Sequence, residues 1–311
     1  MKKITILVPV HNEQDNLPTL YKRLVSLSRS LSSYQFEFLF VNDGSRDQSL
    51  EVIKNLQTRD ARISYISFSR NFGKEIAMIA GIDHVDADAL VIIDADLQDP
   101  PELISKMVSF WEKGYDDVYA KRRTRHDEGW FIKLTSSAFY RIFRWLSDTP
   151  VQLDTGDFRL FSRRAVESLK EFRENQRYNK GIFSWIGYKK KEVLFDRDKR
   201  ASGKSSIGFF KRVNLAVDAI TSFSTKPLRL ASILGLVISF TAFVYAVILI
   251  ARKIFFSVDI SGYTSIMAAV LLLGGMNLIF IGILGEYVGK IFNEIKKRPL
   301  YIIEEIKKGK K

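Results

Sequence analysis

Two long apolar runs near the end of the sequence constrain its fold more than any other feature. One extends from 228 to 250 and the other from 263 to 288. Each is longer than the roughly 20 residues that a helix needs to cross a hydrocarbon core about 30 Å thick. We therefore expect an integral membrane protein with a C-terminal hairpin of two transmembrane helices.

Basic residues on both sides of this hairpin predict its orientation. They are Lys211, Arg212, Lys226, Arg229, Lys290, Lys296, Lys297, Arg298, Lys307, Lys308, Lys310 and Lys311. The positive-inside rule places both ends of the hairpin in the cytoplasm. Arg252 and Lys253, in the joint between the runs, count against this orientation. Gly285 and Gly289 are spaced as in close helix pairs, which predicts either self-association through the hairpin or plain helix flexibility.

The net charge of +13 indicates an anionic partner, either nucleic acid or a membrane surface. Each basic residue near an anionic leaflet contributes on the order of 1 kcal/mol, and no nucleic-acid motif accompanies the charge. We therefore expect a lipid bilayer and no nucleic acid as the partner. The chain has no cysteine, which excludes disulfides and thiolate metal sites, and its three histidines lie far apart in the sequence.

The first part of the chain alternates apolar runs with helical patterns. The runs at 4–10, 36–41, 63–68 and 89–93 predict buried strands with helices between them, the second helix capped by Ser45. This alternation predicts a parallel sheet in a three-layer, Rossmann-type α/β domain. Polar residues follow the first short run at once, so we interpret it as a strand rather than a signal peptide and expect a domain that is not exported.

Polar side chains follow each predicted strand, at the edge of the sheet where α/β proteins bind ligands. They are Glu13, Asp43, Asn71, Lys74, Asp94 and Asp96. Each one alone is also explained as a loop residue or a helix cap. Asp94 and Asp96 are two residues apart, so their carboxylates can point to the same side. Such a pair suits a divalent cation that keeps positions for phosphate oxygens, and the alternative is a solvated acidic loop.

Four further segments have patterns that suggest a function. The segment 130–146 is typical of an amphipathic helix in a membrane interface or of a core-facing helix, and 207–223 is a second amphipathic segment. The segment 200–206 predicts a basic loop that closes over phosphates, and the basic run 121–125 predicts a phosphate contact or a solvated loop. No G-x-G-x-x-G follows the first strand, and Asp198 stands where a P-loop needs its first glycine.

Five motifs occur together in one order: VPVHNE at 8–13, VNDGS at 41–45, RNFGK at 70–74, DADLQDPPE at 94–102 and TGDFR at 155–159. This set resembles family 2 glycosyltransferases. More narrowly, it resembles the bacterial polyisoprenyl-phosphate (undecaprenyl-phosphate) glycosyltransferases, which are similar to dolichol-phosphate mannose synthase. The resemblance covers essentially the whole chain, including the hairpin. It implies a GT-A fold, a nucleotide-sugar donor, Mg²⁺ or Mn²⁺, a polyprenyl-phosphate acceptor and a bacterial-type plasma membrane.

The resemblance also implies a role for each matching position. Pro9, Glu13 and Asp43 would hold a uridine-type nucleoside. Asn71, Lys74 and Asp94 would also bind the donor nucleotide, and Asp96 would bind the metal. Asp157 matches the proposed catalytic aspartate. The phosphate-binding loop matches Arg200, Lys204 and Ser205, although this chain has Ser206 where relatives often have lysine.

The implied reaction is displacement at the anomeric carbon by the acceptor phosphate, with inversion. UDP-glucose or UDP-N-acetylglucosamine is the expected donor. The alternatives are GDP-mannose as donor, another acceptor, or a membrane-tethered nucleotide-sugar-binding or scaffold protein without turnover. A phosphate monoester has a second pKa near 6 and is largely dianionic at neutral pH, so Asp157 would orient the acceptor or take its last proton rather than act as a strict base.

We expect four segments along the chain. A cytoplasmic GT-A domain covers 1–205, and an amphipathic juxtamembrane helix covers 206–226. Two transmembrane helices lie within 227–289, and 290–311 form a basic cytoplasmic tail.

Overall fold

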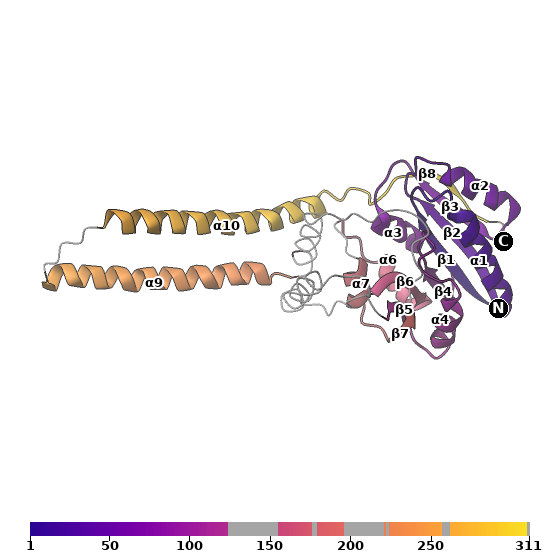
Figure 1. Cartoon of the computed structure of the whole chain (residues 1–311), viewed down its shortest axis with the longest axis horizontal. Helices are drawn as coiled ribbons and strands as arrows, with labels where there is room; N and C mark the ends of the chain where they lie inside the picture. Colours follow the sequence, from indigo (N-terminus) through magenta and orange to yellow (C-terminus); the bar gives the residue numbers. More distant parts are fainter. Residues whose placement is uncertain (124–154, 176–178, 196–220, 222–223, 257–261, 310–311) are drawn as a thin grey trace. The chain divides into compact units, whose positions relative to one another are not determined.

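The computed structural model describes residues 1–123, 155–175, 179–195, 221, 224–256 and 262–309 (Figure 1). The chain divides into two compact units. The first consists of Met1–Arg141, Thr149–Gly208 and Arg298–Lys311, and the second of Ile142–Asp148 and Phe209–Lys297. The predicted amphipathic segments 130–146 and 207–223 lie almost entirely outside the described residues.

A sheet of eight strands forms the centre of the first unit, within the described part of the chain. The strands are β1 (Lys2–Val10), β2 (Tyr34–Asn42), β3 (Ile63–Phe68), β4 (Ala89–Ile92), β5 (Asp117–Arg122), β6 (Thr155–Ser162), β7 (Lys190–Phe195) and β8 (Ile303–Lys307). Their order across the sheet is β7-β5-β6-β4-β1-β2-β3-β8. The four predicted strands are β1 to β4, and they run parallel to one another.

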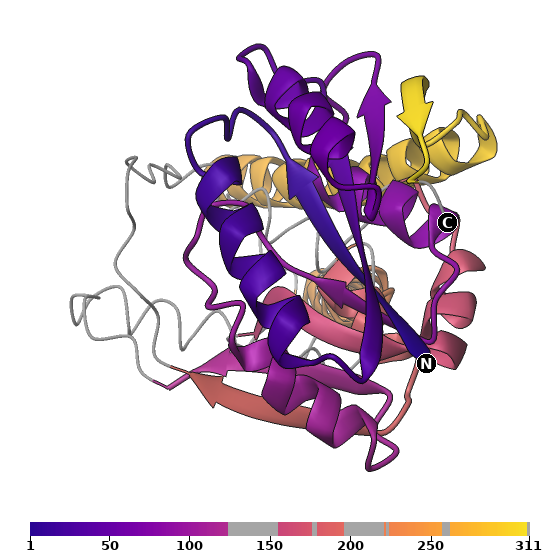
Figure 2. The same ribbon diagram turned by 90° about the vertical axis from the view of Figure 1, so that its right-hand side faces the viewer.

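The sheet as a whole is mixed, so the predicted parallel arrangement holds for β1 to β4 and not for every strand. β6 is antiparallel to both β4 and β5, and β8 is antiparallel to β3. The sequence predicted only a basic tail over 290–311. In the structure this part includes β8, which pairs with β3 at the edge of the α/β domain (Figure 2).

Helices cover both faces of the sheet, which confirms the predicted three-layer architecture. They are α1 (Leu17–Ser30), α2 (Ser49–Arg59), α3 (Lys74–His84), α4 (Leu103–Trp111), α6 (Arg163–Lys170) and α7 (Asn179–Trp185). Alternate residues of β1, such as Ile4 and Ile6, pack with Leu20 of α1 in one core. On the other face, a Cβ at Gly81 of α3 would lie 2.2 Å from Leu7 Cδ1, so the helix needs glycine to approach the sheet.

The second helix begins later than predicted. Ser45 does not cap it, because α2 starts at Ser49. Instead, the Ser45 hydroxyl accepts a hydrogen bond from the Asn12 N–H at 3.0 Å, and the Ser49 hydroxyl accepts one from the Glu13 N–H at 2.8 Å. Both serines therefore tie the connection after β2 to the connection after β1.

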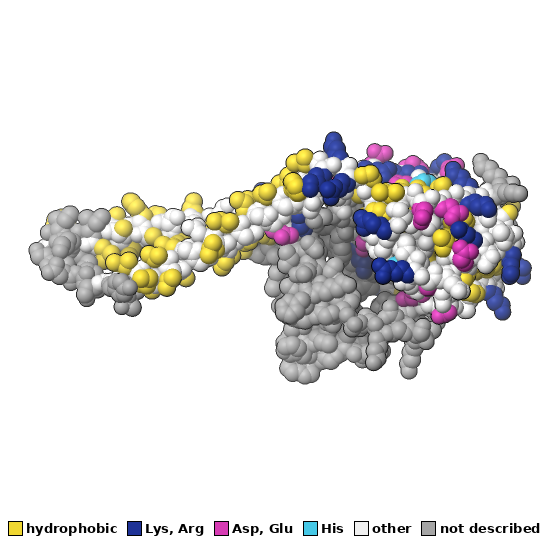
Figure 3. All heavy atoms as spheres, turned by 90° about the horizontal axis from the view of Figure 1, so that it is seen from above, with side chains coloured by type: hydrophobic (Ala, Val, Ile, Leu, Met, Phe, Trp, Pro, Cys, Tyr) yellow, Lys and Arg dark blue, Asp and Glu magenta, His cyan; other side chains and the backbone are white. Residues whose placement is uncertain are grey.

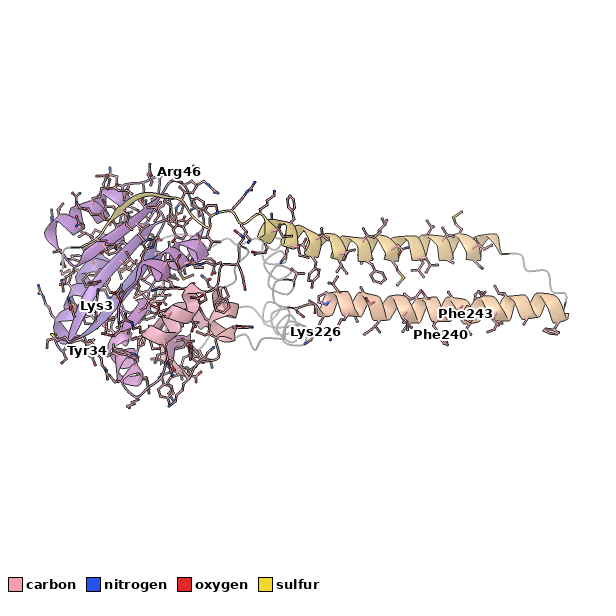
Figure 4. The ribbon with its side chains drawn as sticks, turned by 180° about the vertical axis from the view of Figure 1, so that it is seen from behind. Lys3, Tyr34, Arg46, Lys226, Phe240 and Phe243 are labelled. Atoms are coloured by element: carbon pink, nitrogen blue, oxygen red, sulfur yellow. The ribbon has the colours of Figure 1, made fainter. Side chains whose placement is uncertain are left out.

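The second unit contains two long antiparallel helices, α9 (Lys226–Phe256) and α10 (Tyr263–Ile295). Lys226–Leu249 and Ser265–Ile295 are long and apolar enough to cross a membrane, with a mean hydropathy of 2.4 in each. Hydrophobic side chains run along both helices (Figure 3), and Phe240 and Phe243 of α9 are 66% and 67% exposed (Figure 4). The structure thus contains the predicted pair of apolar helices.

Candidate functional site

The loops that follow β1, β2 and β3 are interlocked at the carboxyl ends of these strands. The Asn12 side-chain carbonyl accepts a hydrogen bond from the Arg46 N–H at 2.8 Å. His11 Nδ1 lies 2.8 Å from the Asp43 carbonyl oxygen and 3.0 Å from Asn71 Nδ2. The predicted ligand-binding edge of the sheet is therefore a continuous surface made by three loops.

Asp43 and Gly44 shape the loop that leads into α3. The buried Asp43 carboxylate accepts hydrogen bonds from the Phe72 N–H at 2.6 Å and the Gly73 N–H at 2.9 Å. Gly44 has φ of +59°, and a Cβ there would lie 2.4 Å from the Arg70 carbonyl carbon. Asp43 was expected to contact a nucleoside; its contacts in the structure are with this loop, and the nucleoside contact stays a prediction.

Lys74, Asp94 and Asp157 come together at the end of β4. The Lys74 ammonium lies 2.7 Å from the Asp94 carboxylate and 2.6 Å from Asp157 Oδ2. The strand register explains this convergence, because Ile92 of β4 pairs with Arg159 of β6. Continuing that antiparallel register by two residues places 94 opposite 157. Three residues predicted separately therefore form one ion-paired cluster, which we call the Lys74 cluster.

The charges in the Lys74 cluster shift its pKa values in different directions. Burial raises the pKa of Asp94 above its ordinary value, although Lys74 opposes this effect. Burial also acts on Asp157, but the charges of Lys74 and Lys180 outweigh it and hold the pKa of that carboxyl below its usual range. Burial alone would lower the pKa of Lys74, but Asp94 and Asp157 raise it. The cluster thus favours an ionised Asp157 beside a charged lysine.

One oxygen of Asp157 is left for a further partner. Asp157 Oδ2 accepts a hydrogen bond from Lys74, whereas the buried Asp157 Oδ1 has no hydrogen-bond partner among the described residues. A buried and unpaired carboxylate oxygen costs free energy unless a ligand or water satisfies it. This oxygen can therefore accept a hydrogen bond from a ligand or a water molecule.

Helix α7 contributes to this site, although no motif in the sequence predicts it. The Asn179 N–H donates to Glu75 Oε2 at 3.1 Å, and Asn179 Nδ2 donates to the Glu75 carbonyl at 3.0 Å. Burial, together with the negative charge of Asp157, raises the pKa of Glu75 to about 7. The next residue, Lys180, supplies positive charge near Asp157. No sequence motif includes 179–180. The only sequence signal for Glu75 is its position directly after Lys74.

A buried ion pair supports the strand that carries Asp157. Arg159, 1% exposed, donates to the Asp117 carboxylate at 3.2 Å and to the Gly156 carbonyl at 3.3 Å. Its guanidinium also lies 4.6 Å from the ring centroid of Phe183. The arginine of the TGDFR motif is therefore part of the scaffold, and it fixes the backbone next to Asp157.

The surroundings of Asp96 fit a divalent cation that is completed by a substrate. The half-buried Asp96 accepts a hydrogen bond from the Gln98 N–H at 3.1 Å, across Leu97 with φ of +61°. The described residues contain no group of three or more histidine, aspartate or glutamate side chains that could hold a metal. Mg²⁺ is commonly held by one or two carboxylates plus phosphate oxygens, and the donor set here meets that pattern.

Some of the other predicted residues lie in the described part of the chain, and the rest lie outside it. Pro9 lies in β1, paired with Val41. Glu13 accepts a hydrogen bond from Asn16 Nδ2 at 2.6 Å, at the start of the connection to α1. Lys121 of the basic run forms an ion pair with Glu192 at 2.8 Å. Arg200, Lys204 and Ser205 lie outside the described residues.

Comparison with known proteins supplies independent evidence. Residues 5–170 match glycosyl transferase family 2, and residues 226–291 match the GtrB C-terminal hairpin. An uncharacterized glycosyltransferase of Synechocystis, sll0501, is 42% identical over 304 residues, which cover 98% of this chain and 95% of the relative. The prophage bactoprenol glucosyl transferase homolog of Escherichia coli K12 is 42% identical, covering 98% and 100%. The bactoprenol glucosyl transferase of Shigella phage SfII is 41% identical, covering 99% of each.

Proposed function

We propose that this chain, which belongs to glycosyl transferase family 2, transfers a hexose from a nucleotide sugar to a polyprenyl phosphate. The family assignment confirms the predicted GT-A fold class and the expectation of a glycosyltransferase enzyme. One observation carries the proposed acceptor: relatives named bactoprenol glucosyl transferase align with the whole chain, including the apolar hairpin. The same relatives favour glucose over N-acetylglucosamine as the sugar, and we therefore propose UDP-glucose as the donor.

The donor would bind at the edge where the three interlocked loops meet the Lys74 cluster. We assign Pro9, Glu13, Asp43 and Asn71 to the nucleoside end. Pro9 lies near the end of β1, and the other three follow the neighbouring strands β1, β2 and β3. Asp96 would hold Mg²⁺ or Mn²⁺ against the diphosphate. When bound, the cation offsets the negative charge that builds on the leaving group.

The reaction exchanges one bond at the anomeric carbon for another. An oxygen of the acceptor phosphate forms a bond to this carbon while the bond to the nucleoside diphosphate breaks, and the bonding electrons leave with the diphosphate. A single in-line displacement inverts the configuration of the sugar. Arg200, Lys204 and Ser205 would contact phosphate oxygens during this step, in keeping with the basic character of their segment.

Within the Lys74 cluster, Asp157 would act at the acceptor end, and Lys74 and Asp94 would face the donor. Asp157 Oδ1, buried and without a partner among the described residues, is placed to orient the acceptor phosphate or to accept its last proton. A carboxylate beside a dianionic phosphate is repelled by it, and the ammonium groups of Lys74 and Lys180 offset that repulsion. Lys74 would also hold Asp94 and Asp157 in place by bonding both.

The apolar hairpin would anchor the enzyme where its acceptor lies. Polyprenyl phosphates are lipids, so an enzyme that uses them needs its site at the bilayer surface. The distribution of basic residues supports a multi-pass protein of a bacterial-type plasma membrane, with the catalytic domain and both termini in the cytoplasm.

A donor panel tests this function. The purified protein is incubated with Mg²⁺, undecaprenyl phosphate and, in turn, UDP-glucose, UDP-N-acetylglucosamine and GDP-mannose, and the lipid products are weighed by mass spectrometry. We expect a hexosyl lipid with UDP-glucose. Tight binding of a nucleotide sugar without any lipid product would instead support the alternative of a binding or scaffold protein.

A further inference from the structure

The segment that follows α10 supports the end of β3 next to the donor site. β8 pairs with β3 from Lys307, opposite Tyr65, to Ile303, opposite Phe68, and Figure 2 shows the two strands side by side. Directly after β3, the Ser69 N–H donates to the Ile302 carbonyl at 3.1 Å. β8 therefore holds the chain at the point where the loop 69–73 begins.

The side chain of Tyr301 continues this contact into the loop. Its ring stacks on Phe68 with 5.2 Å between centroids and 19° between the planes. Phe68, only 1% exposed, meets the Phe72 ring edge-on at 5.6 Å. The Arg70 guanidinium lies 4.0 Å from the Phe72 centroid. A row of packed side chains thus connects Tyr301 with the loop whose backbone N–H groups bind Asp43.

The hydroxyl of Tyr301 contacts the element on the other side of the same loop. It donates to Asp83 Oδ2 at 2.8 Å, in the last turn of α3, and Arg173 donates to the same oxygen at 2.8 Å. The helix begins with Lys74, whose ammonium bonds Asp94 and Asp157. Tyr301 therefore contacts both the strand that enters the loop and the helix that leaves it.

We propose that Tyr301 is a positioning residue of the donor site, which holds the loop 69–73 and α3 so that Asn71 and Lys74 meet the donor. This inference rests on the proposed function for its kinetic readout. It means that the donor site is completed by a residue beyond the apolar hairpin, more than 200 positions from the loop that it supports. Because the ring packs on Phe68, which in turn meets Phe72 of the loop, the stacking rather than the hydroxyl should carry most of the effect.

Three variants separate these contributions. Tyr301→Leu keeps an apolar side chain but removes the ring stack, and Tyr301→Phe keeps the stack but removes the hydrogen bond to Asp83. Glu305→Gln is the matched control, because Glu305 of β8 pairs with Lys54 at 2.9 Å and accepts a hydrogen bond from Tyr65, at positions away from the loop. Thermal unfolding checks that each variant is folded, and calorimetry with UDP and Mn²⁺ measures donor-site binding without turnover.

We expect Tyr301→Leu to weaken UDP binding and raise the KM for the nucleotide sugar about tenfold, as misplacement of binding groups does. The KM for undecaprenyl phosphate should stay within about twofold in every variant, and so should donor binding in Tyr301→Phe and Glu305→Gln. Unchanged UDP binding in Tyr301→Leu would overturn the inference, as would equal losses in Tyr301→Leu and Glu305→Gln. Absence of transfer by the wild type would contradict the proposed function, while UDP binding would still decide the role of Tyr301.

Discussion

Asp94 and Asp157 share one lysine but have opposite pKa shifts. Burial dominates at Asp94 and raises its pKa, whereas at Asp157 the charges of Lys74 and Lys180 prevail and lower it. Two carboxyl groups of one site can thereby take different roles. Under the proposed function, Asp157 would be the ionised group that faces the acceptor, and Asp94 a partner that fixes Lys74.

Replacing Asp96 tests the proposed metal site. We expect Asp96→Ala to weaken Mn²⁺-dependent binding of UDP at least about tenfold, because the cation loses its protein carboxylate. Calorimetric titration of UDP with and without Mn²⁺ measures this change. Asp86→Ala is the control, since Asp86 has an 82% exposed side chain that pairs with Arg163. Unchanged affinity in Asp96→Ala would refute the assignment.

The raised pKa of Glu75 predicts that the stability of the protein depends on pH. Its pKa in the folded protein is about 7, above the ordinary 4.5, so the folded state binds the proton more tightly. Its contribution to stability is complete below pH 4.5 and is lost as the pH rises through 7. Between pH 5 and 8, the wild type should lose stability relative to Glu75→Gln, by at most about 3 kcal/mol.

Denaturant unfolding of the detergent-solubilised protein at pH 5 and pH 8 measures this difference. Glu167→Gln, at an exposed position of α6 where Glu167 pairs with Lys170 at 2.9 Å, is the control and should follow the wild type. Parallel pH profiles for the wild type and Glu75→Gln would show that Glu75 does not titrate in this range.

At the scale of elements, a substitution at Gly44 tests whether the close approach of the interlocked loops stabilises the protein. An alanine there must adopt φ near +59° and place its Cβ 2.4 Å from the Arg70 carbonyl carbon. We expect Gly44→Ala to destabilise the protein by roughly 3 kcal/mol and to weaken UDP binding through the displaced loop. Gly114→Ala is the matched control, because Gly114 has φ of +80° but open space around its Cβ position. Equal losses of stability in both variants would show that backbone strain alone explains the loss, and that the contact of Gly44 with the loop contributes nothing.

The elements also show how far the sequence could predict the structure. The strands β1 to β4 were predictable because each contains a mostly apolar run that is followed by polar residues, and their parallel order brings those residues to one edge. The sequence could not reveal β8, since three of its five residues IEEIK are charged and the segment follows a transmembrane pattern. Nor could it reveal the meeting of Glu75 with Asn179, because contacts between residues 104 positions apart leave no local pattern.

At the scale of the whole molecule, an α/β domain and an apolar hairpin occur in one chain, and each matches a known family over its own part. The proposed substrates divide in the same way, since a nucleotide sugar is soluble in water and a polyprenyl phosphate is held in the bilayer. The acidic motif at 94–96 and Asp157 belong to the domain, and the hairpin would supply access to the lipid. The enzyme would therefore work at the boundary between cytoplasm and membrane.

The central claim is that the Lys74 cluster performs sugar transfer to a lipid phosphate. The most direct measurement is the initial rate of hexosyl-lipid formation by the wild type and Asp157→Asn in liposomes that contain undecaprenyl phosphate, with UDP-glucose and Mg²⁺. We predict that the variant loses at least about 100-fold in rate while its affinity for UDP stays within about threefold, because only the acceptor end is changed. A rate near that of the wild type would contradict the account.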